Sequence, residues 1–123
     1  MNGTPGAVLL PLLALAAACQ EGPVQCAMPM DVFAPPVALQ VAVVDSATGQ
    51  SLLPGARGRW IVGAETDSLR HWGSTLAALG PAGRYTVAVE APGYRAWARS
   101  DIRVRAGECG PEMREVTARM QRE

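Results

Sequence analysis

Hydrophobic and polar residues alternate in short runs from residue 37 to the end of the chain. Segment 83–90 shows the pattern most clearly, because Tyr85, Val87 and Val89 fall on one side of an extended chain. A period of two is typical of β-strands that turn one face toward a core. The same pattern predicts strands over 37–44, 57–65, 66–70, around 97, over 102–104 and over 115–120. These seven short strands predict an all-β sandwich.

Two segments fit more than one type of element. Residues 75–79 fit either a strand or a helical turn. In segment 112–122, Val116 and Met120 belong to a strand-like alternation, but together with Met113 they also fit the spacing of a helix that begins after Gly110-Pro111. We favour a strand for this last segment, because the rest of the domain is built of strands.

Turn signals separate the predicted strands. Asp45 can accept hydrogen bonds from the backbone that follows it, and Gly49 can take a positive φ, so 45–49 is expected to be a turn. Ala91-Pro92-Gly93-Tyr94 has Pro and Gly where a type II turn requires them. We expect the Tyr94 ring to anchor that turn against the sandwich.

Composition excludes several classes of protein. The formal net charge is zero, which argues against a nucleic-acid binder, because such proteins need excess positive charge to displace counterions from phosphates. The 13 glycines and 10 prolines are too many for a helical bundle, and 49% hydrophobic residues are too many for a disordered chain.

The N-terminal segment has the features of an export signal. Residues 7–18 form an uncharged apolar run that is too short to span a bilayer as a helix. Leu15-Ala16-Ala17-Ala18-Cys19 resembles a bacterial lipobox, in which the signal is cut before the cysteine and the thiol carries the lipid. The alternative is an ordinary signal peptide that is cut after Ala18 and leaves Cys19 free. We therefore expect a signal peptide over 1–18, a lipidated Cys19 with a proline-rich tether over 19–36, and one sandwich domain over 37–123.

The cysteine count agrees with export. The chain has three cysteines, an odd number that needs an explanation in an oxidising compartment. Lipidation of Cys19 leaves Cys26 and Cys109, which we expect to form a disulfide. The spacing of the cysteines and of His71, the single histidine, matches no metal site, so no metal is expected.

Several short motifs resemble one known family. They are Val41–Asp45, Thr48-Gly49, Leu53-Pro54-Gly55-Ala56, Gly83–Val89 and Ala91-Pro92-Gly93-Tyr94. In these motifs the chain resembles the carboxypeptidase regulatory-like domain family, in small bacterial lipoproteins that carry this domain alone. The resemblance covers about 37–120 and implies a seven-stranded, transthyretin-like β-sandwich. It does not imply peptidase activity, because a zinc carboxypeptidase needs a His-x-x-Glu motif and a second, distant histidine, whereas His71 is the single histidine here and Ser74 stands three positions after it.

The sequence predicts a binding module that is not an enzyme and uses no cofactor. It has no lysine, one histidine and no clustered carboxylates, so the usual groups for Schiff-base, metal and general acid–base chemistry are missing. We expect His71 and Trp72 to lie in a loop whose exposed ring could contact a partner. The predicted function is a lipid-anchored module that binds an envelope protein or has a structural role, held in the outer membrane and facing the periplasm. The alternative is a carbohydrate-binding module that uses exposed aromatic rings such as Trp72.

Overall fold

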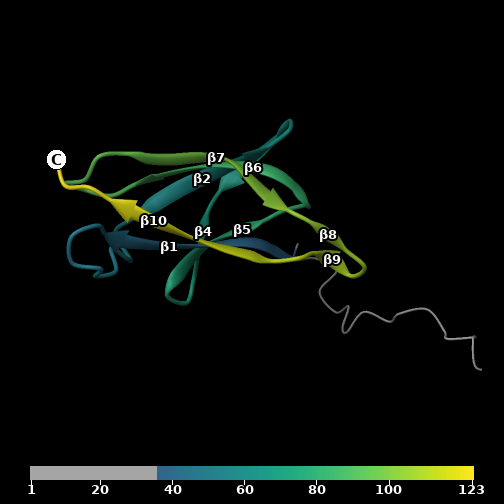
Figure 1. Ribbon diagram of the computed structural model, residues 1–123, viewed down its shortest axis with the longest axis horizontal. Helices are drawn as coiled ribbons and strands as arrows, with labels where there is room; N and C mark the ends of the chain where they lie inside the picture. The colour runs from purple at the N-terminus through teal and green to yellow at the C-terminus, as the bar shows by residue number, and fades with distance from the viewer. Residues whose placement is uncertain (1–35) are drawn as a thin grey trace, which may run out of the picture.

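The computed structural model describes residues 36–123, which form two four-stranded β-sheets packed face to face (Figure 1). The first sheet has the order β10-β1-β5-β4 and contains β1 (Val37–Asp45), β4 (Arg70–Trp72), β5 (Thr75–Leu79) and β10 (Arg114–Met120). The second sheet has the order β3-β2-β6-β7 and contains β2 (Arg57–Val62), β3 (Glu65–Ser68), β6 (Gly83–Glu90) and β7 (Trp97–Val104). A small ribbon of β8 (Ala106–Gly107) and β9 (Gly110–Pro111) extends from one end. The predicted all-β sandwich is confirmed.

The two sheets hold eight strands where the alternation predicted seven, and part of the difference arises at Leu69. Segment 66–70 divides there between β3, which pairs with β2, and β4, which pairs with β5 in the other sheet. Leu69 is buried at this crossing, and its backbone N–H donates to the Gly58 carbonyl at 2.8 Å. The chain therefore passes from the second sheet to the first at a single buried leucine. The alternation of residues does not reveal this change of sheet.

Both ambiguous segments are strands. Residues 75–79 form β5, and the predicted strand in 112–122 is confirmed as β10, which pairs in parallel with β1. Val116 and Met120 are buried in β10, whereas Met113, which a helical face would bury with them, is 46% exposed. Pairing with β1 therefore makes this segment a strand, although its hydrophobic residues also fit the spacing of a helix.

β7 is one continuous strand, where the sequence predicted two, one around residue 97 and one over 102–104. Its pairing with β6 shifts between Tyr85 and Val87, so that Ser100 and Asp101 both lie opposite Thr86. Asp101 has φ +57°, a conformation that few residues other than glycine adopt. Trp97 and Ile102 are five positions apart, an odd separation that would place them on opposite faces of a regular strand. The extra residue of this β-bulge lets both face the interior.

The core lies between the inward faces of the sheets. Tyr85 is fully buried, its ring lies 5.4 Å from that of Trp60, and its hydroxyl donates to the Pro81 carbonyl at 2.7 Å. Burial, with a smaller contribution from Glu65, raises the pKa of Tyr85 to about 12. The phenol therefore stays protonated and keeps this hydrogen bond at neutral pH. The largest fully buried aliphatic side chains are Leu39, Leu76, Ile102, Met120, Val41, Val43, Val87, Val89 and Val104.

Gly58→Ala is expected to destabilise the sandwich by about 2–3 kcal/mol, because this site in β2 has no space for a side chain. An added Cβ would lie 2.6 Å from both the Ala88 carbonyl oxygen and Leu69 Cδ1. The backbone oxygen belongs to a paired strand and cannot move independently. Urea unfolding followed by circular dichroism measures the loss. Gly55→Ala is the matched control, because its nearest neighbour would be 3.7 Å away, and an equal loss in both variants would contradict the steric argument.

Candidate functional site

His71 and Trp72 lie in a strand and not in the loop that the sequence suggested. Both belong to β4, which a two-residue turn, Gly73-Ser74, joins to β5. Gly73 has φ +65°, as tight hairpin turns require, and the Thr75 hydroxyl donates to the Trp72 carbonyl at 3.1 Å. The expected loop is therefore corrected to a tight hairpin, because residues 75–79 form the strand that closes it.

The hairpin places His71 and Trp72 on opposite faces of the first sheet. His71 lies opposite Leu76, which is buried, whereas Trp72 lies opposite Thr75. Residues that face each other in an antiparallel pair point to the same side, and neighbours along a strand point to opposite sides. The two candidate residues therefore do not form one site, and only Trp72 lies on the outer face.

Trp72 begins a row of small side chains that crosses the outer face of the first sheet. Its neighbour in β5 is Thr75, Ala42 of β1 faces the same side, and Thr117 of β10 lies opposite Ala42. We call this row, Trp72, Thr75, Ala42 and Thr117, the Trp72 face. Trp72 is 48% exposed, and its neighbours in the row have small side chains.

A row with three polar residues borders the Trp72 face. It crosses the same four strands and consists of Arg70, Gln40 and Glu115, with the buried Ala77 between Arg70 and Gln40. Sequence analysis identified Trp72 but missed its neighbours on the sheet, because they come from strands whose pairing depends on the fold. An exposed ring beside small residues, with charged and amide groups one row away, is suited to contact with another macromolecule.

A buried carboxylate ties together the end of the sandwich at which β1 and β10 finish. Asp45, only 2% exposed, accepts hydrogen bonds from the backbone N–H groups of Ala47 and Thr48 at 2.7 and 3.0 Å. Its second oxygen accepts from the Tyr94 hydroxyl at 2.6 Å and from Arg122 Nε at 3.0 Å. The Arg122 guanidinium also lies 5.8 Å from the centre of the Tyr94 ring. We call Asp45, Tyr94 and Arg122 the clasp.

The clasp confirms Asp45 as a turn residue and shows a role that sequence analysis missed. The hydrogen bond from Tyr94 is the first of several that hold the pKa of the Asp45 carboxyl well below its usual range. The same bond raises the pKa of Tyr94, and Asp45 raises that of Arg122. Arg122 follows the last strand, so nothing in the alternation pointed to it. Both oxygens of Asp45 accept hydrogen bonds from groups of the same chain, so the clasp is a structural element.

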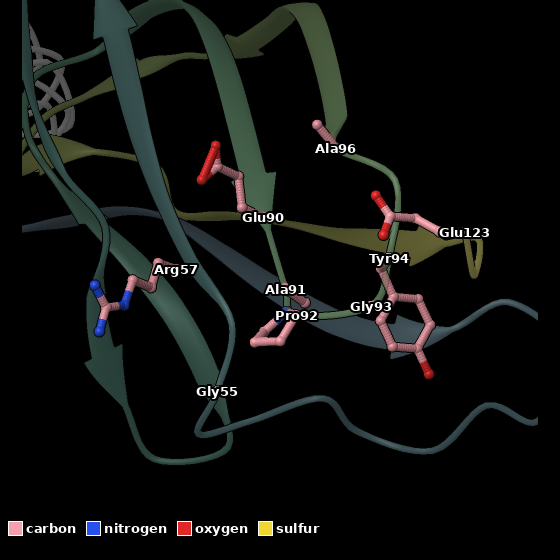
Figure 2. Close-up of a pocket in the computed structure, with 9 residues that line it drawn as sticks. All are labelled: Gly55, Arg57, Glu90, Ala91, Pro92, Gly93, Tyr94, Ala96 and Glu123. Atoms are coloured by element: carbon pink, nitrogen blue, oxygen red, sulfur yellow. The ribbon is translucent and has the colours of Figure 1, made fainter.

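A depression next to the clasp is lined by 90–94, Gly55, Arg57, Ala96 and Glu123. Figure 2 shows that the side chains of Arg57, Glu90 and Glu123 point in different directions and do not meet at one point. The depression therefore does not bring its charged side chains together as a binding site would.

The predicted lipidation and the predicted disulfide involve cysteines outside the described residues. Cys19 and Cys26 lie outside them, and Cys109 lies in the turn that joins β8 to β9, so lipidation and the disulfide stay predictions. Within residues 36–123, no three side chains of His, Cys, Asp or Glu gather as a metal site would require. The described part of the chain also contains no helix that could span a bilayer.

Comparison with known proteins gives no assignment, because no protein-family model and no curated protein matches the chain. The resemblance to carboxypeptidase regulatory-like domains thus stays a hypothesis that rests on the short motifs.

Proposed function

We propose that this protein is a non-catalytic, lipid-anchored binding module of the bacterial envelope and that it contacts a protein partner through the Trp72 face. The observation that carries the proposal is a half-exposed tryptophan held on a tight hairpin beside small residues. Tryptophan is over-represented among the residues that dominate binding energy at protein interfaces. A ring fixed on a paired strand also loses little conformational freedom on binding.

The resemblance supplies the finer description of the fold in this proposal. A carboxypeptidase regulatory-like domain with a transthyretin-like arrangement is supported by two packed four-stranded sheets and by the Pro92-Gly93-Tyr94 turn. Fold alone carries little information on function, so the role is argued from the Trp72 face.

The anchor in this proposal is the lipidated Cys19, with residues 19–36 as the tether. Such an attachment raises the effective concentration of the domain for neighbours in the envelope. We expect the protein to fractionate with the outer membrane and Cys19→Ala to appear in the soluble periplasm. Recovery of both forms in the same fraction would contradict lipidation.

A disulfide between Cys26 and Cys109 would fix the tether to the ribbon of β8 and β9. In the chain-entropy model, closing a loop of this length contributes roughly 4–5 kcal/mol to stability. Alkylation without reductant, followed by intact-mass measurement, should find no free thiol at either position. Labelling of both cysteines would contradict the disulfide.

A photo-crosslinking amino acid at position 72 tests the binding surface. Position 61 is the matched control, because Ile61 is similarly exposed, at 44%, but lies on the second sheet. We expect a crosslinked species from position 72 that is absent from position 61 and is lost when an unmodified chain competes. Equal products from both positions, or none from position 72, would exclude the Trp72 face as the docking surface.

The second candidate function is carbohydrate binding, which the exposed ring of Trp72 favours. Carbohydrate-binding surfaces usually stack two or three rings on a sugar chain, whereas Trp60 and Tyr85 are buried in the core. A glycan array screened with wild type and Trp72→Ala separates the two functions. Glycan binding that depends on Trp72 would replace the protein-binding proposal.

A further inference from the structure

The free edge of β10 differs from the other sheet edges among residues 36–123. β4 and β3 are edge strands of only three and four residues, and β7 is interrupted by the bulge at Asp101. β10 has seven residues in continuous register with β1 and no other strand partner in its sheet. Short length and bulges protect an edge against pairing with another chain. β10 has neither of these two protections. Its hydrogen bonds toward the second sheet lie at its ends: Arg114 donates to the Arg103 carbonyl of β7 at 3.1 Å, and Gln121, which follows β10, accepts from the Arg95 backbone N–H at 2.8 Å.

The charges on β10 are placed symmetrically about its centre. Thr117 is the middle residue of Arg114–Met120, with Glu115 two positions before it and Arg119 two positions after it. Both charged residues are exposed and point away from the core, because Val116 and Ala118 between them are buried. Neither side chain forms an ion pair or hydrogen bond within residues 36–123.

This symmetry selects one way for two copies of β10 to pair. In a two-fold antiparallel pair, residues opposite each other point to the same side of the sheet, so outward residues must meet outward residues. Centring the pair on Thr117 satisfies this condition and pairs all seven residues of each strand. It also places Glu115 opposite Arg119 of the second copy, and Arg119 opposite Glu115. Moving the centre to Val116 or Ala118 shortens the pairing and loses both ion pairs.

We propose that the protein forms a homodimer through antiparallel pairing of β10 with β10 of a second copy, centred on Thr117. The pairing satisfies the outward backbone groups of both edges and joins the two first sheets into one eight-stranded sheet. Opposite charges that face each other across such a pair are stabilising. The two-fold axis passes through the sheet, so both Trp72 faces lie on the same side of the dimer. The dimer shares Thr117 with the Trp72 face but needs neither the Trp72 ring nor the anchor. Its test at position 117 can therefore fail or succeed independently of the crosslinking test at position 72.

Disulfide trapping in cells tests the dimer on the full chain. Position 117 is the only one in β10 that faces itself across the two-fold axis, and the Cα separation of opposite residues suits a disulfide. After mild oxidation, Thr117→Cys is expected to run as a dimer on a non-reducing gel. Thr66→Cys is the matched control, an exposed threonine in the edge strand β3. No dimer from Thr117→Cys, or equal dimer from both variants, would overturn the proposal.

Charge reversal then tests the register. Adding Glu115→Arg to Thr117→Cys places like charges opposite each other twice and is expected to reduce the trapped dimer roughly tenfold. Adding Arg119→Glu as well restores both ion pairs and is expected to restore the dimer. This register would be excluded if the single reversal left the amount of trapped dimer unchanged, or if the double reversal failed to restore it. Resistance to proteolysis reports that each variant is folded.

Discussion

Trp60→Ala is expected to lower the free energy of unfolding by about 3–5 kcal/mol. Trp60 is 4% exposed, packs against the Tyr85 ring at 5.4 Å and lies so close to Gly80 that a Cβ there would be 2.8 Å from its ring. Truncation removes this apolar contact area and leaves a cavity that paired strands on both sides keep open. A domain of this size is commonly stable by only about 5–15 kcal/mol, so the variant should lose a large part of its stability. Urea unfolding followed by circular dichroism measures the loss.

The other tryptophans serve as graded controls for this prediction. Trp97 is partly buried against the core, so Trp97→Ala should lower the free energy of unfolding less than Trp60→Ala. Trp72→Ala should change it little, because Trp72 is 48% exposed. Trp60→Phe should lose less than Trp60→Ala, because it keeps a ring against Tyr85 and removes an indole N–H that has no partner within residues 36–123. Equal losses for all three alanine variants would contradict the assignment of Trp60 to the core.

Asp45→Asn is expected to lower the melting temperature at pH 7 by roughly 10 °C and to flatten its dependence on acid pH. The amide keeps the shape of the side chain but loses the charge that Tyr94 and Arg122 stabilise. An aspartate titrates near pH 4 in an unfolded chain, and the clasp holds the folded pKa well below that. The stabilisation is therefore complete above about pH 4 and is lost as pH falls toward the folded pKa.

Melting curves between about pH 2 and pH 7 check this prediction. Wild type should lose stability steeply at the acid end, whereas Asp45→Asn should change less over the same interval. Tyr94→Phe is the intermediate case, because it removes one donor and keeps the carboxylate. Parallel curves for wild type and Asp45→Asn would show that the clasp does not control acid stability.

Local patterns predicted most of the strands, whereas β4 and the assignment of each strand to a sheet depended on long-range pairing. Alternation around Tyr85 and in 37–44 identified β6 and β1, because each of these strands has one buried face. The division at Leu69 could not be predicted, since it depends on which sheet each half of 66–70 joins. The same limit applied to the candidate site. Trp72 is visible as an aromatic residue in a polar segment, but Ala42 and Thr117 become its neighbours only through pairing across three strands.

The clasp shows the same distinction between local and distant partners. Asp45 was identified as a turn residue because its first two partners follow it directly in sequence. Its link to Arg122 joins positions 77 apart, and no periodicity reports such a contact.

The parallel pairing of β1 with β10 has a consequence for the order of folding. Val41 and Val116 are direct partners although 75 positions separate them, and β10 is synthesised after every other strand of the two sheets. Contacts between such distant segments slow folding, so we expect the sandwich to form in milliseconds to seconds. Until β10 arrives, one edge of β1 remains open and the hydrophobic side chains that β10 covers remain in water. Such late closure would suit the export that we propose for this chain, because an export channel for unfolded chains requires a domain that has not yet closed.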